Sequence, residues 1–341
     1  MAILAQGCIR AAYAEPAARR KTGPSLRRSP RDALPARGHA TSVPPESRSV
    51  MSMQGKVVVI TGSNDGIGKE TAVGVAAQGA STVLACRNQE KADAAAREVT
   101  RRTGNDDVHV VALDLADLAS VEEAAAEILS RWHRLDVLIN NAGGIWTERH
   151  ETAQGFEQTF GVNHLGHFYL TELLLHRITE SAPSRIINLT SVGHHAAWRG
   201  MRFDDLQSEK RYATMDAYGR SKLANILFTR ELAARVAGTG VTVNAVHPGP
   251  VRSGFGMDGD MGGLMGLGNR LIRPFEISPS AGARTSVYLA TSPEVEGVTG
   301  RYWVRRRPGH MSRQARSNAQ AQRLWSESER LVSSAGFTTE P

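Results

Sequence analysis

Two residues four positions apart form the pair in this chain best suited to chemistry. On a helix, Tyr218 and Lys222 would emerge on the same face, about one turn apart. The pKa of a free phenol is about 10, and a neighbouring ammonium stabilises the phenolate. We therefore expect Lys222 to lower the pKa of Tyr218 towards neutrality, where proton transfer is most effective. The pair predicts acid–base chemistry, whereas the plain alternative is an ordinary helix that carries an exposed Tyr and Lys.

A glycine-rich turn follows the first apolar segment of the chain. Residues Lys56–Thr61 form a β-branched run typical of a parallel strand buried on both faces. The turn 62–68 and a helical stretch, Lys69–Gln78, come next. Glycines let the backbone approach a pyrophosphate, and a helix N-terminus offers it free N–H groups. The spacing G-x-x-x-G-x-G is not the usual G-x-G-x-x-G. We expect a dinucleotide to contact Gly62, Ser63, Asn64, Gly66 and Ile67.

The second strand, Ser81–Arg87, ends in a cation. At this position of dinucleotide folds an acid binds a ribose 2′-OH, whereas an arginine suits a 2′-phosphate. Arg87 therefore predicts that NADP(H) is preferred, with NAD(H) also accepted. Two observations weigh against this interpretation: loop arginines are common in so Arg-rich a chain, and Asp65 in the glycine turn would repel a phosphate.

The next two strands also end in residues suited to a cofactor. A third strand is expected over Val108–Leu113 and a fourth over Leu135–Asn140. The carboxylate that follows the third strand could face an adenine amino group. Small residues and amides after the fourth strand leave room for a flat ring and satisfy exposed strand ends. The expected contacts are Asp114, Leu115, Asn141, Ala142 and Gly143.

Strands and helices alternate along most of the chain, which predicts an α/β fold. We expect a single doubly wound Rossmann domain over 53–304, with a mainly parallel seven-stranded sheet, helices on both faces and the site at the strand carboxyl ends. The remaining expected elements are helices at 88–103, Val121–Trp132 and Pro279–Ala290, and strands at Arg185–Ser191, Val241–His247 and Gly300–Val304. The polar tail 305–341 is expected to hold one loosely attached helix.

Charge and composition exclude several classes of protein. The net charge is +7, but residues 1–50 hold nine Lys or Arg against three acids, so a folded nucleic-acid-binding surface is not expected. No apolar run approaches the roughly 18 residues of a membrane span. Cys8 and Cys86 suggest neither a disulfide framework nor a metal site, so a reducing, cytoplasmic setting is the default. The leader 1–52 is either disordered, a targeting peptide, or the result of a misassigned start before Met51 or Met53.

The motifs together identify a family. In order and approximate spacing, the chain over about 53–304 resembles the short-chain dehydrogenase/reductase family and, within it, the retinol-dehydrogenase-like branch. The family motifs are Thr61-Gly62-x-x-x-Gly66-Ile67-Gly68, Asn140-Asn141-Ala142-Gly143 and Tyr218-x-x-x-Lys222. The resemblance to the branch rests on Val162–Phe168, Ser221–Asn225 and Val246–Gly249.

The resemblance implies roles for further residues. Ser191 corresponds to the catalytic serine that binds the substrate oxygen, although Thr190 lies beside it. Asn163 corresponds to the asparagine that holds a water in the proton relay, and a buried amide bonded to backbone is the alternative. The turn at Pro248 and Gly249 corresponds to the one that packs beside the nicotinamide. His164 and His167 are interpreted as packing residues rather than metal ligands, because no third ligand lies nearby.

These features predict reversible, NADP(H)-dependent interconversion of a carbonyl and an alcohol on a small or lipophilic substrate. A non-catalytic dinucleotide-binding regulatory protein is the alternative. The stretch Val251–Ile277, rich in Gly and Met, is interpreted as a lid over an apolar substrate or as a long surface loop. His194, His195 and Trp198 could line the substrate pocket or simply pack. By analogy with the family, a homodimer or homotetramer is expected.

Overall fold

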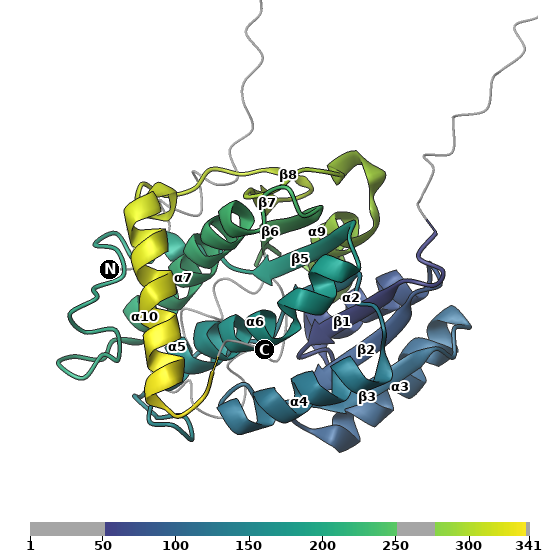
Figure 1. The fold of residues 1–341 in the computed structure, drawn as a ribbon, viewed down its shortest axis with the longest axis horizontal. Helices are drawn as coiled ribbons and strands as arrows, with labels where there is room; N and C mark the ends of the chain where they lie inside the picture. The colour runs from purple at the N-terminus through teal and green to yellow at the C-terminus, as the bar shows by residue number, and fades with distance from the viewer. Residues whose placement is uncertain (1–51, 251–276, 339–341) are drawn as a thin grey trace, which may run out of the picture. The chain divides into compact units, whose positions relative to one another are not determined.

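The computed structural model describes residues 52–250 and 277–338 of the chain (Figure 1). Apart from Ser52, the expected leader lies outside the described residues, and the expected lid lies outside them except for Ile277. The prediction of a doubly wound α/β fold is confirmed. Among the described residues, no helix is both long and apolar enough to cross a membrane.

The described strands form one sheet in the order β3-β2-β1-β4-β5-β6-β7-β8. From β3 to β7 every neighbouring pair is parallel. The chain winds outwards from β1 in one direction and from β4 in the other, so a crevice opens at the carboxyl ends of these two strands. The bounds are β1 Val57–Thr61, β2 Ser81–Cys86, β3 Val108–Ala112, β4 Val137–Asn140, β5 Ser184–Leu189, β6 Val241–His247, β7 Tyr302–Val304 and β8 Arg307–Pro308.

Helices cover both faces of the sheet because the strands are apolar on both. In β1, Val57 and Val59 join one core cluster, whereas Val58 and Ile60 join the other. The first cluster includes residues of α4, α6, α7 and α10, and the second includes residues of α2, α3 and α9. The helices are α2 Gly66–Ala76, α3 Gln89–Thr103, α4 Leu118–Arg131, α5 Gln158–Phe160, α6 Gly166–Glu180, α7 Thr214–Arg235, α9 Pro279–Thr291 and α10 Asn318–Ser334.

Short helical segments lie in the connections between these elements. A π-helical segment precedes α6, and a 3-10 helix follows β5. Such π-helical insertions are rare and frequently occur at functional sites. The segments are η1 Gly161–Leu165, η2 Val192–Ala196, η4 Pro293–Val295 and η5 Gln314–Arg316.

The expected number of seven strands was wrong by one short strand. After β7 the chain turns at Arg305 and Arg306, whose φ angles are 50° and 62°. It returns as the antiparallel strand β8, which pairs with β7 at the edge of the sheet. Tight hairpins with two left-handed residues usually carry Asn-Gly or Asp-Gly. Two arginines give no such signal, so the sequence pattern did not reveal the turn.

The expectation that the C-terminal helix is only loosely attached was also wrong. On α10, Leu324, Trp325 and Val332 are buried and belong to the same core cluster as α7. The Trp325 ring centroid lies 5.1 Å from that of Phe168 and 5.8 Å from that of Phe228. Apolar residues recur at helical spacing on one face of α10, so this face is fixed to the core despite the polar composition of the segment. Figure 1 shows α10, in yellow, beside α7.

Candidate active site

The glycine turn after β1 is packed so tightly that side chains would not fit. Gly62 has a φ of +62°, and a Cβ added to it would lie 2.8 Å from Ala142 Cβ. A Cβ on Gly68 would lie 2.3 Å from the carbonyl oxygen of Gly62 and 2.5 Å from Asn141 Nδ2. Helix α2 begins at Gly66, three residues before the expected Lys69, so the turn runs directly into the helix. The glycines therefore allow α2 to approach the ends of β1 and β4 closely.

The N-terminus of α2 has no side-chain cap. Its N-cap residue, Asp65, makes no capping hydrogen bond, and Asn64, Gly66 and Ile67 are each partly exposed. Ser63 differs from them, because its side chain is buried and its hydroxyl donates to the Ile60 carbonyl at 2.9 Å. The first-turn N–H groups of α2 thus lie at the surface of the turn, in an arrangement suited to an anion. Through its side chain, Ser63 shapes the turn.

The end of β4 is clamped to the glycine turn. Asn141 Nδ2 donates to the carbonyl oxygens of Thr61 at 2.8 Å and Gly62 at 3.1 Å. In return, Thr61 Oγ1 accepts from the N–H groups of Asn141 at 2.9 Å and Ala142 at 3.0 Å. The prediction that amides satisfy exposed strand ends here is confirmed. Thr61 is a residue whose side-chain role the sequence did not reveal, although it belongs to the motif.

Asn163 lies in η1 and is fully buried. Its Oδ1 accepts from the Gly144 N–H at 2.8 Å, and its Nδ2 donates to the Gly144 carbonyl at 2.9 Å and to Ser221 Oγ at 3.0 Å. The expectation of a buried amide bonded to backbone is confirmed. A Cβ on Gly143 would lie 2.9 Å from Asn163 Oδ1 and 3.2 Å from Lys222 Nζ. Gly143 therefore leaves the space into which these two side chains project.

The structure distinguishes the two hydroxyls at the end of β5. Thr190 is buried, and its Oγ1 donates to the Lys222 carbonyl at 2.7 Å. Ser191 is partly exposed; its Oγ accepts from the Gly193 N–H at 3.0 Å and also interacts with the Tyr218 side chain. Thr190 thus anchors α7, while Ser191 faces the tyrosine.

Tyr218 and Lys222 lie one turn apart on α7, but their electrostatics differ from the expectation. Lys222 Nζ lies over the Tyr218 ring, 5.6 Å from its centroid. Burial lowers the pKa of Lys222 to about 8. Burial also raises the pKa of Tyr218, with the Ser191 hydrogen bond acting in the opposite direction. The prediction that Lys222 brings the phenol's pKa towards neutrality was wrong for the protein alone, because desolvation of the buried phenolate dominates.

The remaining predicted cofactor residues lie at or just after strand carboxyl ends. Arg87 follows β2, is exposed, and its side chain makes no hydrogen bond or ion pair within the described part of the chain. Asp114 is partly exposed, and its Oδ1 accepts from the Ala116 N–H at 2.9 Å. Leu115 is buried beside Gly166. Pro248 and Gly249 follow β6, and a Cβ on Gly249 would lie 2.9 Å from Ile277 Cδ1.

His164 and His167 are packing residues, as expected. His164 is buried between aromatic rings and hydrogen-bonds Ser328 Oγ at 3.0 Å. His167 is buried and hydrogen-bonds Thr61 Oγ1 at 2.8 Å. Within 52–250 and 277–338, no three His, Cys, Asp or Glu side chains gather in a way that could hold a metal.

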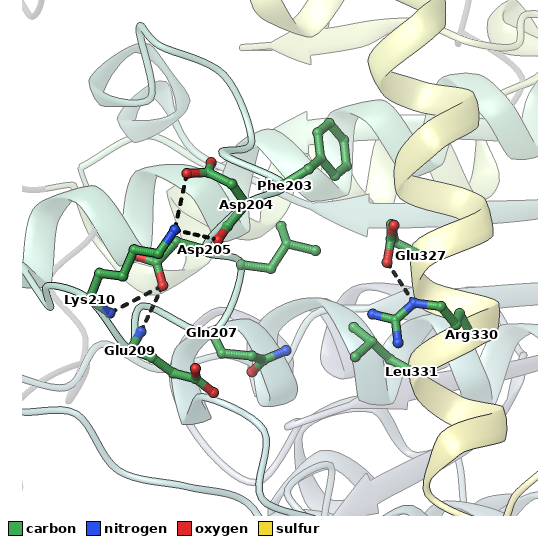
Figure 2. A pocket seen from close by; sticks show the side chains of 10 residues that line it. Phe203, Asp204, Asp205, Gln207, Glu209, Lys210, Glu327, Arg330 and Leu331 are labelled. Carbon is green, nitrogen blue, oxygen red and sulfur yellow. Dashed lines mark hydrogen bonds and ion pairs between the residues drawn. The ribbon is translucent and has the colours of Figure 1, made fainter.

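A surface hollow lies between α10 and the loop before α7 (Figure 2). Its walls are mainly polar, and the Lys210 ammonium is held by Asp204, with Nζ 3.0 Å from the backbone carbonyl oxygen. Opposite, Glu327 pairs with Arg330 on α10. None of the predicted catalytic or cofactor residues lines it. The hollow is therefore separate from the candidate active site.

The fold and the motifs define the class of the protein. A family model described as "Enoyl-(Acyl carrier protein) reductase" matches residues 62–304. The chain belongs to the short-chain dehydrogenase/reductase family.

Individual relatives agree with this assignment. The chain is 47% identical to mouse retinol dehydrogenase 12 over 282 residues, covering 83% of this chain and 88% of the relative. A crystal structure of an uncharacterised protein from Mycobacterium Paratuberculosis has a TM-score of 0.67 and 34% identity, covering 86% of this chain and 97% of the other. The 3-ketoacyl-(acyl-carrier-protein) reductase from Brucella melitensis, complexed with NADH, has a TM-score of 0.57 and 25% identity, covering 74% and 96%. The chain is therefore an oxidoreductase that acts on an alcohol or carbonyl group, not a purely regulatory dinucleotide-binding protein.

Proposed function

We propose that the enzyme transfers a hydride reversibly between NADP(H) and the carbonyl or alcohol carbon of a small or lipophilic substrate. Lys222 carries the proposal. Its side chain is only 4% exposed, yet Nζ makes no hydrogen bond or ion pair with the described residues. A buried ammonium without hydrogen-bond acceptors is costly unless a bound group supplies them. The hydroxyls of a nicotinamide ribose, beside Tyr218, would supply them.

Other features of the site fit a dinucleotide. The tight turn at Gly62 and Gly68 leaves backbone rather than side chains at the uncapped end of α2. Asn141 Oδ1 is buried and has no hydrogen-bond partner among the described residues. When bound, the cofactor supplies or accepts the hydride. We assign Pro248 and Gly249 to the nicotinamide side and Asp114 with Leu115 to the adenine side, as the family resemblance implies.

The proton chemistry follows from the environment of Tyr218. A phenol with its ordinary pKa of about 10 is protonated at neutral pH, and burial raises the pKa of Tyr218 further. Tyr218 can therefore donate to the substrate oxygen as negative charge develops there. Ser191 stabilises the same oxygen by a hydrogen bond. The Lys222 ammonium, held over the phenol ring, stabilises the phenolate that remains after the transfer.

Asn163 helps to position Tyr218 and Lys222 and is proposed to assist proton supply from solvent. Its amide joins the Gly144 backbone to Ser221, whose own Oγ donates to the Tyr218 carbonyl at 2.9 Å. Ser221 thereby transmits the position of η1 to the tyrosine. In the sequence, Ser221 was noted only as part of the branch motif Ser221–Asn225, which revealed no role for its side chain.

Arg87 supports the preference for NADP(H). Its guanidinium is exposed at the end of β2 and is not engaged by any described side chain. An arginine at this place suits a 2′-phosphate. The named retinol dehydrogenases among the relatives support a lipophilic alcohol or aldehyde as substrate.

The test replaces Tyr218 by Phe. Removing the proton donor is expected to lower kcat by roughly 10²- to 10⁴-fold, while the Kd for NADPH changes little. Turnover would be followed by nicotinamide absorbance with a panel of aldehydes and ketones that includes retinal. Cofactor binding would be followed by NADPH fluorescence. The matched control is Tyr288→Phe, which removes a phenol on α9 that bonds Glu294 and should keep normal turnover. Full activity in Tyr218→Phe would reject the assignment.

A further inference from the structure

The loop that follows Ser191 is held by the C-terminal segment, defined here as residues 309–338. These residues follow the last strand, and the sequence had predicted there a polar tail with one loosely attached helix. Three hydrogen bonds make the connection: the Ser312 N–H donates to His194 Nε2 at 3.2 Å, Gln314 Nε2 donates to the Trp198 carbonyl at 2.9 Å, and Gln320 Oε1 accepts from the Met201 N–H at 3.1 Å.

Gln314 and Gln320 hydrogen-bond each other as well as the loop. Gln320 Nε2 donates to Gln314 Oε1 at 2.6 Å. Gln320 also lies against Gly200, where the φ is +82° and an added Cβ would lie 2.4 Å from Gln320 Oε1. The amide of Gln320 therefore occupies the space that a side chain at Gly200 would need. The position of the Gln320 amide and the position of the loop therefore depend on each other.

His194 lies where this connection reaches the active site. Its Nδ1 lies 2.7 Å from the Ser191 carbonyl oxygen, and because a carbonyl can only accept, Nδ1 carries the proton. Nε2 is then the acceptor for the Ser312 N–H. The ring is fully buried, lies edge-to-face with Tyr302 at 5.3 Å between centroids, and has its pKa lowered to about 4 by burial. One neutral tautomer therefore satisfies both contacts at physiological pH.

The orientation of Ser191 depends on the same few residues. Its carbonyl accepts from both the backbone N–H of His194, at 3.1 Å, and the ring Nδ1. Its hydroxyl accepts from the Gly193 N–H, and a Cβ on Gly193 would lie 3.0 Å from Tyr218 Cε1. Rotation of this turn would therefore move Ser191 Oγ relative to the tyrosine with which it interacts.

We propose that His194 is a positioning residue for Ser191, held in place by the C-terminal segment. The neutral ring joins the Ser191 carbonyl on one side to the Ser312 N–H on the other. Gln314 and Gln320 fix the rest of the loop. The C-terminal segment is thus part of the active-site architecture without touching substrate. This inference rests on the proposed role of Ser191.

The first experiment separates the two contacts of His194. In His194→Asn the side-chain N–H can still reach the Ser191 carbonyl, whereas in His194→Gln the amide extends towards Ser312. We expect His194→Asn, which loses only the Ser312 contact, to lower kcat less than His194→Gln, which loses the Ser191 contact and should lower kcat about 10- to 100-fold, the loss associated with misplacement of about 1 Å. The NADPH Kd should stay unchanged in both. Equal kcat values in the two variants would overturn the proposal.

The second experiment asks whether His194 acts through Ser191. His194→Gln is combined with Ser191→Ala, and kcat is measured on the residual activity. Because the substituted residue has no hydroxyl to position, we expect the added loss from His194→Gln to shrink to less than about twofold. An undiminished loss in the double variant would show general damage and would overturn the proposal. Full turnover in Ser191→Ala would instead refute the proposed function, so the two failures are distinguishable.

The third experiment tests the C-terminal segment itself. Gln320→Ala removes the contact with the loop, whereas Gln322→Ala changes an exposed residue of the same helix. We expect a fall in kcat with an unchanged NADPH Kd only for Gln320→Ala, with circular dichroism confirming that both variants fold. Normal turnover in Gln320→Ala would overturn the proposed support of the loop, even if His194→Gln did not fold.

Discussion

The half of the sheet from β1 to β4 and the chain after β7 differ in how the amino-acid sequence specifies their structures. From β1 to β4, short sequence patterns predicted each strand, the glycine turn and the residues at the strand ends. After β7, polar composition concealed a short strand and the packing of the predicted helix against the core. The first region is specified by neighbours in sequence, because glycines and β-branched runs act locally. The second is specified by partners far along the chain, such as His194 and Ser312, which are 118 positions apart.

The largest expected effect tests whether α10 belongs to the core. Trp325 is 3% exposed and packs on Phe168 and Phe228. Trp325→Ala is expected to reduce the free energy of unfolding by about 3–5 kcal/mol, the usual cost of truncating a large buried aromatic side chain. Urea denaturation would measure it, with exposed Arg330 replaced by Ala as the control. A loss below about 1 kcal/mol would restore the picture of a loosely attached tail.

The next effect concerns the histidine that joins η1 to α10. His164 lies in η1, is buried against Ser328, and has its pKa lowered to about 4 by burial. The unfolded chain takes up a proton near pH 6.5, so the stabilisation is complete above that pH and is lost as pH falls towards 4. The expected slope for this residue is up to about 1.4 kcal/mol per pH unit.

Replacement of His164 by Gln tests the contribution of this histidine to the pH dependence of stability. The unfolding free energy, measured by urea at several pH values between 7.5 and 4.5, should depend less steeply on pH in His164→Gln than in the wild type. His194, His167 and His247 would preserve part of the slope, because burial lowers their pKa values as well. The exposed His176 provides the control variant, His176→Gln. Identical slopes in His164→Gln and the wild type would contradict the assignment.

A smaller stability effect, with loss of cofactor binding, is expected in the locally encoded region. Gly68→Ala would place a Cβ 2.3 Å from the Gly62 carbonyl oxygen, a backbone atom that cannot move aside easily. We expect a loss of about 1–3 kcal/mol in stability and markedly weaker NADPH binding, measured by denaturation and fluorescence titration. Gly104→Ala is the control, since that site has open space and only a positive φ. Normal NADPH binding by Gly68→Ala would disprove the close approach of α2.

The smallest expected effect is a change in cofactor preference caused by one exposed arginine. Arg87→Ala should lower kcat/KM with NADPH by about tenfold, or about 1.4 kcal/mol, and leave kcat/KM with NADH nearly unchanged. The cause is the loss of one exposed guanidinium from a 2′-phosphate. Arg97→Ala, another exposed arginine, is the control. A similar loss with both cofactors would remove the basis for the NADP(H) preference.

Much of the candidate site could be predicted, but with uneven precision. The pattern Tyr218-x-x-x-Lys222 correctly placed both residues on one helix, yet the direction of the tyrosine's pKa shift was wrong. Desolvation depends on every atom packed around the phenol, and no local pattern records it. The family resemblance favoured Ser191 over its neighbour Thr190, and the structure separates the two by engaging Thr190 with the Lys222 carbonyl. The oligomeric state stays a prediction.

The sequence by itself determined the alternation of strands and helices, the glycine turn and the spacing of the residues proposed for catalysis. These features arise from backbone preferences and periodicities that span only a few residues. Tertiary structure alone decided the burial of Lys222, the attachment of α10 and the connection from Ser312 through His194 to Ser191. Such contacts join distant parts of the chain, and their energies depend on dehydration and close packing that exist only once the fold has formed.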